Sequence, residues 1–358
     1  MNALLLLRDW RRQVQNDLLS GLHGHQSKAL ADLSFAMSLA QHCQSGRLAV
    51  AAPGRAQPAS VERRIERFLA NDRIDPDTTW SPMARSLVAG WAGGPILLIR
   101  DETPNHHDLR CLKLTVAYRQ RAWPLGCACY TLGGRPEPMP QLVVGLRRRV
   151  AACLPQGAEV TLLADPGLAW PQVVDTCGKL GWHYVLRLLS QTRVHTAEGR
   201  DCAASELAPH PGTCWRGEAR IFKKAGWRAA AVAACWLPDG DGPWLLVSDR
   251  NDGPRLFRRY AQRVWTEELF KDEKSSGFHG GESRVKTPVH AARLVLLMAL
   301  ATYLSLAVGS RVIQAGLRRF LESTHQRMLS LFTIGTRWIM FCMTHDRSLP
   351  KSLSPVPP

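Results

Sequence analysis

Residues 93–103, GGPILLIRDET, carry the pattern that decides the fold: a Gly-Pro break, four consecutive apolar residues and an acidic end. An apolar run bounded by turn residues predicts a buried strand, and this one ends at Asp101. Residues 159–167, EVTLLADPG, repeat the arrangement and place Asp165 at the end of a second strand. The chain is therefore expected to contain two buried strands that each end in an aspartate.

Strand and helix patterns alternate around these two segments. Further strands are predicted in LKLTVAYRQ (112–120), CACYTLGG (127–134) and HYVLRLL (183–189), and helices over 141–154 and 169–182. Three strands, a helix, a strand, a helix and a strand predict the α/β class, with a mixed sheet flanked by helices. Residues at adjacent strand ends line a common crevice, so Asp101 and Asp165 are expected to converge. Turn chemistry alone, however, explains a single aspartate at a strand end.

Helical and β-rich segments lie on either side of this core. Helical periodicity is visible over 4–22, 28–43 and 60–69, with a connecting loop, AAPGRAQPAS, at 51–60. Short alternating runs with many Gly and Pro residues over 190–250 predict a β-rich insertion. Helices are predicted again over 254–278, 287–308 and about 310–342, and the Pro- and Ser-rich end, 346–358, is expected to be disordered.

These patterns divide the chain into five parts. The predicted parts are a helical domain (1–90), the first part of the α/β core (91–189), the β-rich insertion (190–250), the end of the core (251–310) and a basic helical region with its tail (311–358).

The charge balance indicates a polyanionic partner. The chain has 46 Lys and Arg residues against 30 Asp and Glu residues in 358, a formal net charge of +16. Such an excess favours nucleic acid as the partner. Hydrophobic residues make up 45% and charged residues 21%, which excludes a disordered or fibrous chain. The longest apolar stretch, residues 294–308, is shorter than the roughly 20 residues that cross a membrane, so it is interpreted as a buried helix and no membrane partner is expected.

The ten cysteines have neither a CxxC pair nor a histidine at zinc-finger spacing. They are predicted to be free thiols in a reducing cytoplasm. His106, His107 and Cys111 offer three metal-ligating side chains, but no fourth ligand follows at a suitable spacing, so a polar loop is the preferred interpretation.

Residues 260–274, YAQRVWTEELFKDEK, contain the most specific spacing in the chain. At about 100° per residue, Tyr260, Arg263, Glu267 and Lys274 fall within roughly 60° of one helix face. Glu268, the rival acid, points about 100° away from this face. A solvated helix with favourable Glu and Arg spacing is the alternative, but it leaves the two preceding strand-end aspartates unexplained.

This spacing, Y-x2-R-x3-E-x6-K, resembles the signature of the DDE transposases of the IS-four insertion-sequence group. The resemblance extends to DET at Asp101, to LLADPG at Asp165, to the β-rich insertion and to the apolar helix that follows, over roughly residues 60–310. It implies an RNase H-like core.

The resemblance also implies a site and a reaction. Asp101, Asp165 and Glu267 would bind two Mg²⁺ ions, for which Mn²⁺ can substitute, and would cut DNA at the element ends and join the 3′ hydroxyls to target DNA. Two such ions can stabilise both the attacking and the leaving oxygen of an in-line displacement. Tyr260, Arg263 and Lys274 would contact the backbone of the transposon end. Residues 1–90 would bind the double-stranded terminal repeats, and the assembly on DNA would be a homodimer in the cytoplasm.

Two other functions stay open on the sequence. One is an RNase H-like nuclease that cuts without strand transfer, and the other is a domesticated DNA-binding protein that no longer cuts. Among other acids, Glu102 is expected on the opposite side of its strand, Asp175 within a helix and Asp249 at a strand end in the insertion. The tryptophans of the insertion, Trp227, Trp236 and Trp244, either stack on a distorted base or form a small core.

Overall fold

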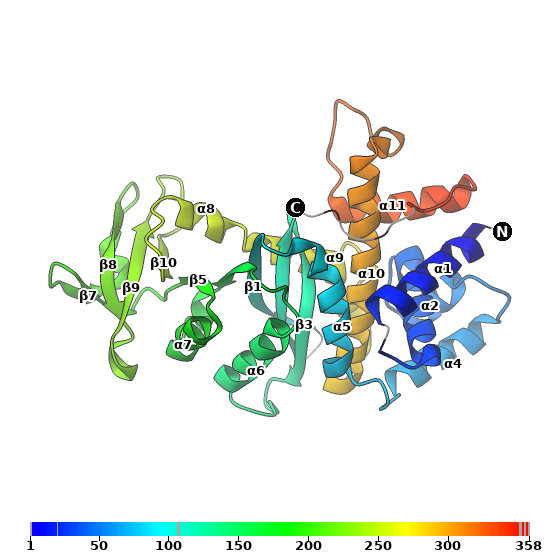
Figure 1. Ribbon diagram of the computed structural model, residues 1–358, viewed down its shortest axis with the longest axis horizontal. Coiled ribbons are helices and arrows are strands. Elements are labelled where there is room, and N and C mark those ends of the chain that lie inside the picture. The colour runs from blue at the N-terminus through cyan, green and yellow to red at the C-terminus, as the bar shows by residue number, and fades with distance from the viewer. Residues whose placement is uncertain (1, 20, 106–107, 351–352, 354–355, 357–358) are drawn as a thin grey trace.

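The protein is elongated, with helices at one end, a helix-covered sheet in the centre and a β-rich lobe at the other end (Figure 1). The computed structural model describes residues 2–19, 21–105, 108–350, 353 and 356. The predicted candidates His106 and His107 lie outside the described residues, and Cys111 lies within a strand rather than in a loop.

The N-terminal part is helical, as predicted, and contains two helices that the sequence analysis missed, α3 and α5. Its elements are α1 (Asn2–Gln13), a π-helical turn (Val14–Leu18), α2 (Gly24–Ala40), α3 (Ser45–Ala51), α4 (Pro58–Leu69) and α5 (Pro76–Val88). The longer of these two, α5, starts at the Asp75 side chain, which accepts a hydrogen bond of 3.0 Å from the backbone of Asp77. Pro82 inside this helix weakens its pattern in the sequence.

One ten-stranded mixed sheet runs through the centre and the β-rich lobe, in the order β3-β2-β1-β4-β5-β10-β9-β8-β6-β7. The pairs β1–β4 and β4–β5 are parallel and the others are antiparallel. The strands are β1 (Pro95–Pro104), β2 (Leu109–Tyr118), β3 (Arg121–Thr131), β4 (Glu159–Ala164), β5 (His183–Arg187), β6 (Arg193–Thr196), β7 (Asp201–Ala203), β8 (Cys214–Ile221), β9 (Arg228–Cys235) and β10 (Trp244–Ser248). The predicted mixed sheet flanked by helices is confirmed.

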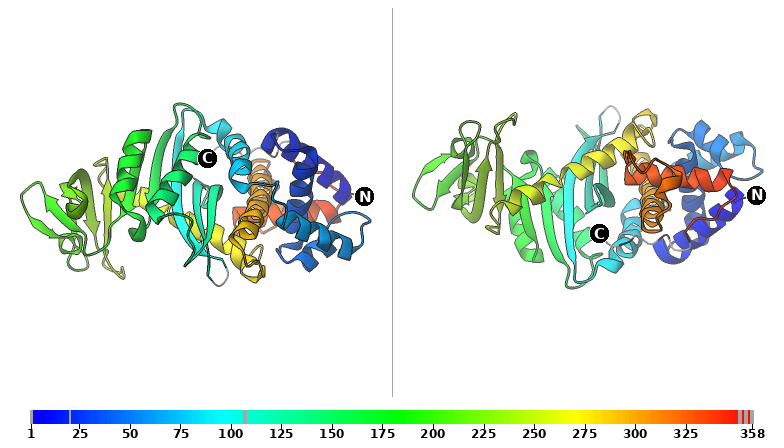
Figure 2. Two further views of the ribbon diagram at one scale, coloured as in Figure 1. Left: turned by 90° about the horizontal axis from the view of Figure 1, so that it is seen from below. Right: turned by 90° about the horizontal axis from the view of Figure 1, so that it is seen from above.

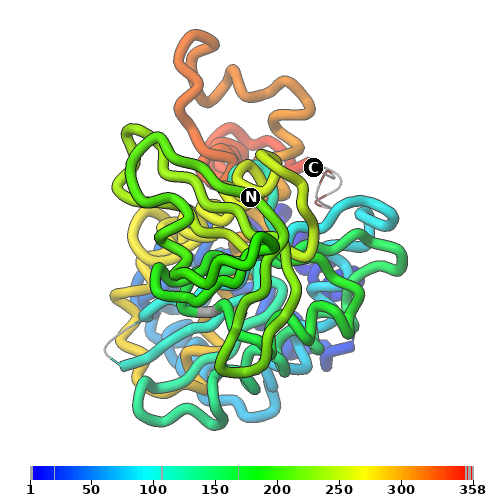
Figure 3. Tube along the Cα trace, turned by 90° about the vertical axis from the view of Figure 1, so that its left-hand side faces the viewer, coloured from blue at the N-terminus to red at the C-terminus, as the bar shows by residue number. Residues whose placement is uncertain are grey.

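The β-rich segment between β5 and α8 extends the central sheet. Its last strand, β10, pairs antiparallel with β5 along Leu246, Val247 and Ser248. Viewed from that end, the strands of this lobe lie in front of the core (Figure 3). The insertion is thus joined to the core by sheet hydrogen bonds as well as by the chain.

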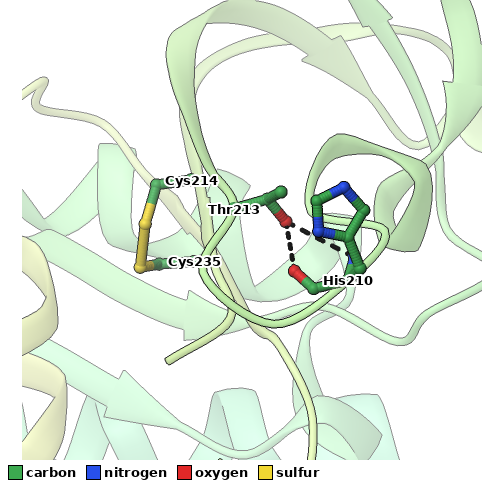
Figure 4. The surroundings of a disulfide bond; sticks show 4 residues. All are labelled: His210, Thr213, Cys214 and Cys235. Atoms are coloured by element: carbon green, nitrogen blue, oxygen red, sulfur yellow. Dashed lines mark hydrogen bonds between the residues drawn. A yellow bond between two sulfur atoms is a disulfide. The ribbon is translucent and has the colours of Figure 1, made fainter. Parts of the chain in front are cut away.

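Cys214 and Cys235 form a disulfide in this lobe (Figure 4), which corrects the prediction that all ten cysteines are free. They lie directly opposite each other on β8 and β9, with their Cα atoms 4.1 Å apart. A separation of 21 residues in sequence does not reveal such a register. The other eight cysteines are free thiols. The inference of a reducing environment, which rested on free cysteines, therefore loses part of its support.

Helices cover both faces of the core sheet (Figure 2). On one face lie α6 (Met139–Ala151) and α7 (Pro171–Leu180), and on the other lie α8 (Arg255–Ala261) and α9 (Val264–Lys274). Alternate strand residues serve the two faces, since Leu98 belongs to the larger core and Ile99 to the smaller core beneath α8 and α9. A residue two positions after Ile99, Asp101, therefore also points toward α8 and α9.

The long helix α10 (Pro288–Gln314) stands between the sheet and the N-terminal helices (Figure 1). It is long and apolar enough to cross a membrane, yet 94% of its most apolar window is buried inside the protein. This confirms the predicted buried helix. The helix predicted over 310–342 is wrong: α10 ends at Gln314, Gly316 adopts a left-handed conformation, and α11 (Leu331–Thr344) begins after a loop.

The described part of the chain end is ordered against the core, contrary to the predicted disorder. Leu349 and Leu353 are buried, and the Tyr118 hydroxyl donates a hydrogen bond of 2.7 Å to the Val356 carbonyl. The remaining positions of this predicted tail, 351–352, 354–355 and 357–358, lie outside the described residues.

Candidate active site

Asp101 and Asp165 lie at the same level of two neighbouring parallel strands, Asp101 within β1 and Asp165 directly after β4. The register pairs Arg100 of β1 with Ala164 of β4, so the next residue of each strand is an aspartate. The prediction that the first strand ends at Asp101 is wrong, because β1 continues to Pro104 and Asp101 pairs with Lys113 of β2, whereas β4 ends at Ala164 directly before Asp165. The predicted convergence of the two acids is confirmed: Oδ2 of each lies 2.9 Å from the same Arg263 nitrogen, Nη1.

The 260–274 segment is two helices rather than the single helix expected. Tyr260 lies in α8, Arg263 directly precedes α9, and Glu267 and Lys274 lie in α9. The junction is closed by bonds between residues three apart, including Arg263 N to Tyr260 O at 2.9 Å and Thr266 N to Arg263 O at 3.1 Å. Hydrogen bonds of this kind are typical of a 3₁₀ helix, which has about three residues per turn. The side chains of Tyr260 and Arg263, three residues apart, therefore lie on the same side of the chain.

Five of the six predicted site residues meet at this junction. The Tyr260 hydroxyl donates a hydrogen bond of 3.0 Å to Oδ1 of Asp165. Arg263 uses Nη1 for Asp101 and Asp165, and it pairs through Nη2 with Oε1 of Glu267. The guanidinium thus joins carboxylates that come from two strands and one helix.

Lys274 lies elsewhere, at the other end of α9. At 1.5 Å per residue, the seven residues that separate it from Glu267 place it about 10 Å along the helix. It is half-buried, and its Nζ lies 5.9 Å from the centre of the Phe270 ring. Burial and the nearby charge of Lys113 lower its pKa.

Tyr260 is buried in this conformation, with 3% of its surface exposed. Its ring meets Trp244 edge-on at 5.4 Å, and its hydroxyl is bonded to Asp165. Tyr260 therefore holds the Asp165 side chain in place, and Trp244 belongs to the packing behind it. Glu267, by contrast, keeps 45% of its side chain exposed.

Three carboxylates and one guanidinium give the cluster a net negative charge. The pKa of Asp101 is raised to about 6, chiefly by burial and also by the charges of Asp165 and Glu267, which together outweigh the lowering effect of Arg263. Burial lowers the pKa of Arg263, but Asp165 and Asp101 outweigh it and the net shift is upward. The pKa of Tyr260 is raised by burial and by the Asp165 charge.

The acids that the sequence analysis set aside lie in other pairs. Glu102 accepts a hydrogen bond of 2.5 Å from Tyr130, Asp175 lies 3.1 Å from Arg228, and Asp249 lies 2.6 Å from His183. Glu268 lies 3.4 Å from Arg121 and 2.6 Å from Lys271. In the described parts of the chain, none of these partners belongs to the group of Asp101, Asp165, Glu267 and Arg263 (the Arg263 cluster).

The Arg263 cluster fits hard divalent cations. Carboxylate oxygens are the ligands that Mg²⁺ and Mn²⁺ prefer in proteins. Three carboxylates around one guanidinium leave the cluster with excess negative charge, which favours cations. Burial raises the pKa of Asp101 because it disfavours the charged carboxylate. A bound cation would stabilise that charged form.

Two other groups of potential metal ligands were missed by sequence reasoning. In the described parts of the chain, Cys111, Cys127 and Cys129 lie within 4.8 Å of one another, as do His42, His279 and Glu282. In each group one member, Cys111 or His42, comes from a different strand or a distant segment, so spacing in the sequence did not reveal the complete group. His42 is poorly suited to bind a metal ion, because its Nδ1 accepts a hydrogen bond of 3.1 Å from Gln44 and its Nε2 faces Glu282 at 3.4 Å.

A comparison with protein families identifies the family of this chain. The family model of the transposase DDE domain matches residues 100–304, a span that includes all six predicted site residues. No curated protein matches the chain. Since the matched span covers more than half of the sequence, the chain belongs to the family of transposase DDE domains.

Proposed function

We propose that the protein is a DNA transposase that cuts phosphodiester bonds at the ends of its own element and joins the 3′ hydroxyls to target DNA. The observation that carries the proposal is the meeting of Asp101, Asp165 and Glu267 around Arg263. The family match and the net charge of +16 support DNA as the substrate. Membership of the IS-four group is part of this proposal and rests on the 260–274 spacing.

Asp101, Asp165 and Glu267 would hold two divalent ions, Mg²⁺ or Mn²⁺. When bound, such ions stabilise the attacking and the leaving oxygen of an in-line displacement. The three carboxylates supply the ligands, and Tyr260 keeps Asp165 oriented through its hydroxyl. The first attacking group is water and the second is the freed 3′ hydroxyl of the DNA.

Arg263 has two tasks in this proposal. Without DNA it offsets part of the charge of the three carboxylates, as its contacts with all of them indicate. When the carboxylates take cations, the guanidinium is released to a phosphate of the cleaved strand, for which its planar fork is suited. Arg255 and Arg258 are exposed on the adjoining helix α8 and extend the positive surface for the DNA backbone.

Three further assignments belong to the proposal. Lys274 contacts the same strand farther from the cut, because it lies along α9 from Glu267. Residues 1–90 bind the terminal inverted repeats, and a homodimer pairs the two ends. All three assignments concern how the protein binds and pairs the ends of the element rather than how it cuts them.

The test uses the DNA that flanks the gene, with purified full-length protein and either Mg²⁺ or Mn²⁺. Pre-cut ends with a 3′ hydroxyl are compared with ends that carry a 3′ deoxy terminus. Transposition predicts end-specific cuts and joined products that need the 3′ hydroxyl. Cutting without joining would favour the nuclease, and binding without cutting in both metals would favour the domesticated DNA-binding protein.

A further inference from the structure

Three free cysteines converge on one face of the β2–β3 hairpin. The register places Cys111 of β2 directly opposite Cys129 of β3, and Lys113 opposite Cys127. Because alternate residues share a face, the three sulfur atoms point to the same side of the sheet. The Sγ atoms of Cys111 and Cys129 lie 3.3 Å apart, those of Cys127 and Cys129 lie 3.6 Å apart, and all three lie within 4.8 Å of one another.

Positive charge surrounds these thiols. Lys113, on β2, is fully buried and pairs with Glu273 of α9. It lies two residues from Cys111 and directly opposite Cys127. Hydrogen bonds with Cys127 and Cys129 lower the pKa of the Cys111 thiol, and the charges of Lys113 and Lys274 lower it further. The pKa values of the Cys127 and Cys129 thiols are instead raised, first by their hydrogen bonds with Cys111 and also by burial, so Cys111 is the thiol of this group that loses its proton most readily.

We propose that Cys111, Cys127 and Cys129 form a zinc-binding site, separate from the acid cluster. Zn–S bonds of about 2.3 Å in tetrahedral geometry separate the sulfur atoms by about 3.8 Å. The observed sulfur separations of 3.3 and 3.6 Å need only a small adjustment to reach that value.

The chemistry of the site is balanced and selective. Three thiols release three protons, one Zn²⁺ takes three thiolates, and a water molecule completes the tetrahedron, which leaves one net negative charge. Lys274 offsets that charge, whereas the charge of Lys113 is already paired with Glu273. Sulfur ligands select zinc over Mg²⁺, which prefers oxygen, so the site does not compete for the ions of the acid cluster. Cys129, the least buried of the three, gives the ion a route from solvent.

The position of the site gives it a structural consequence. β3 is the edge strand of the sheet, paired on one side only with β2. An ion held by Cys111 on β2 and by Cys127 and Cys129 on β3 would link these two strands beneath the C-terminal end of α9. Zinc is therefore expected to raise the melting temperature of the reduced protein.

The test is a zinc titration of the reduced, metal-free full-length protein against a chromophoric chelator, with Co²⁺ as a spectroscopic probe of thiolate ligands. We expect one zinc ion per chain, a thiolate-to-cobalt charge-transfer band, and protection of these three thiols from alkylation. Cys129→Ser, a near-isosteric change at the partly exposed position, should weaken binding at least about tenfold. Cys153→Ser, which alters a buried thiol outside the group, and Glu267→Gln should both bind zinc like the wild type.

Three results would overturn the site. They are zinc binding by Cys129→Ser equal to that of the wild type, full alkylation of the three thiols in the presence of zinc, and a Cys111–Cys129 disulfide whose reduced form takes up no zinc. Circular dichroism of each variant verifies the fold, and Cys127→Ser repeats the test at a second ligand.

Discussion

Arg263 donates a hydrogen bond from Nη1 to Oδ2 of Asp101 at 2.9 Å, and the two side chains are 15% and 13% exposed. The pair joins the residue before α9 to strand β1, 162 positions apart in sequence. Asp165 and Glu267 lie on the same guanidinium. One cationic side chain therefore faces three carboxylates. The cluster retains a negative charge that a divalent ion can neutralise.

Replacing Arg263 tests whether its positive charge stabilises the three carboxylates. In the absence of divalent ions, Arg263→Ala should lower the free energy of unfolding by about 2 kcal/mol, because a largely buried carboxylate loses its partner. Saturating Mg²⁺ or Mn²⁺ should shrink that loss, since bound cations replace the missing charge. Urea unfolding with and without the ions measures both values. Arg258→Ala on the exposed face of α8 is the control, and a loss that the ions leave unchanged would contradict the account.

The packing of α10 against α11 depends on glycine. A Cβ atom added at Gly335 would lie 1.7 Å from the Ser305 carbonyl oxygen of α10. Gly335→Ala should therefore destabilise the protein by about 3 kcal/mol, because two backbones must separate. At Gly145 in α6, an added Cβ meets nothing within 4 Å. Gly145→Ala should leave stability unchanged or raise it by up to about 1 kcal/mol. Thermal unfolding decides, and equal effects of the two changes would contradict this packing.

Asp272 should make stability depend on pH. Burial raises its pKa to about 7 from 3.8, although Arg121 lies 3.0 Å away and lowers it. Because the folded pKa is the higher one, the folded state binds more protons between these values, and the contribution of this group to stability falls as pH rises through about 7. The free energy of unfolding of Asp272→Asn, relative to that of the wild type, should therefore rise by about 2 kcal/mol between pH 5 and pH 8.

Urea midpoints at the two pH values measure this difference. Asp239→Asn, at an exposed aspartate, serves as the matched control and should keep a constant difference from the wild type. A constant difference for Asp272→Asn as well would show that its carboxyl is not perturbed by burial.

The core sheet and most of the acid cluster could be predicted from the sequence because both depend on local patterns. Apolar runs that end in Asp101 and Asp165 define two strands, and a shared helix face brings Arg263 and Glu267 to them. The start of β3 escaped prediction because Pro124 lies within it, and proline is tolerated there because β3 is an edge strand.

Features that depend on register between distant segments could not be predicted. The Cys214–Cys235 disulfide and the Cys111, Cys127 and Cys129 group form only once strands pair. The tight turn before α9 also escaped, since the periodicity of an ordinary helix fits residues 260–274 equally well. The same periodicity placed Lys274 on the helix face that carries Glu267. It did not show that Lys274 lies at the other end of α9, away from the acids.

The most direct test of the central claim compares two adjacent glutamates in end cleavage with Mg²⁺ and with Mn²⁺. Glu267→Gln removes one carboxylate of the cluster at nearly constant shape, whereas Glu268→Gln alters an acid paired with Arg121 and Lys271. We expect the cleavage rate at the element ends to fall at least about 100-fold in Glu267→Gln and to change by less than about threefold in Glu268→Gln. End-specific cleavage by Glu267→Gln at the wild-type rate in both metals would contradict the assignment of the active site.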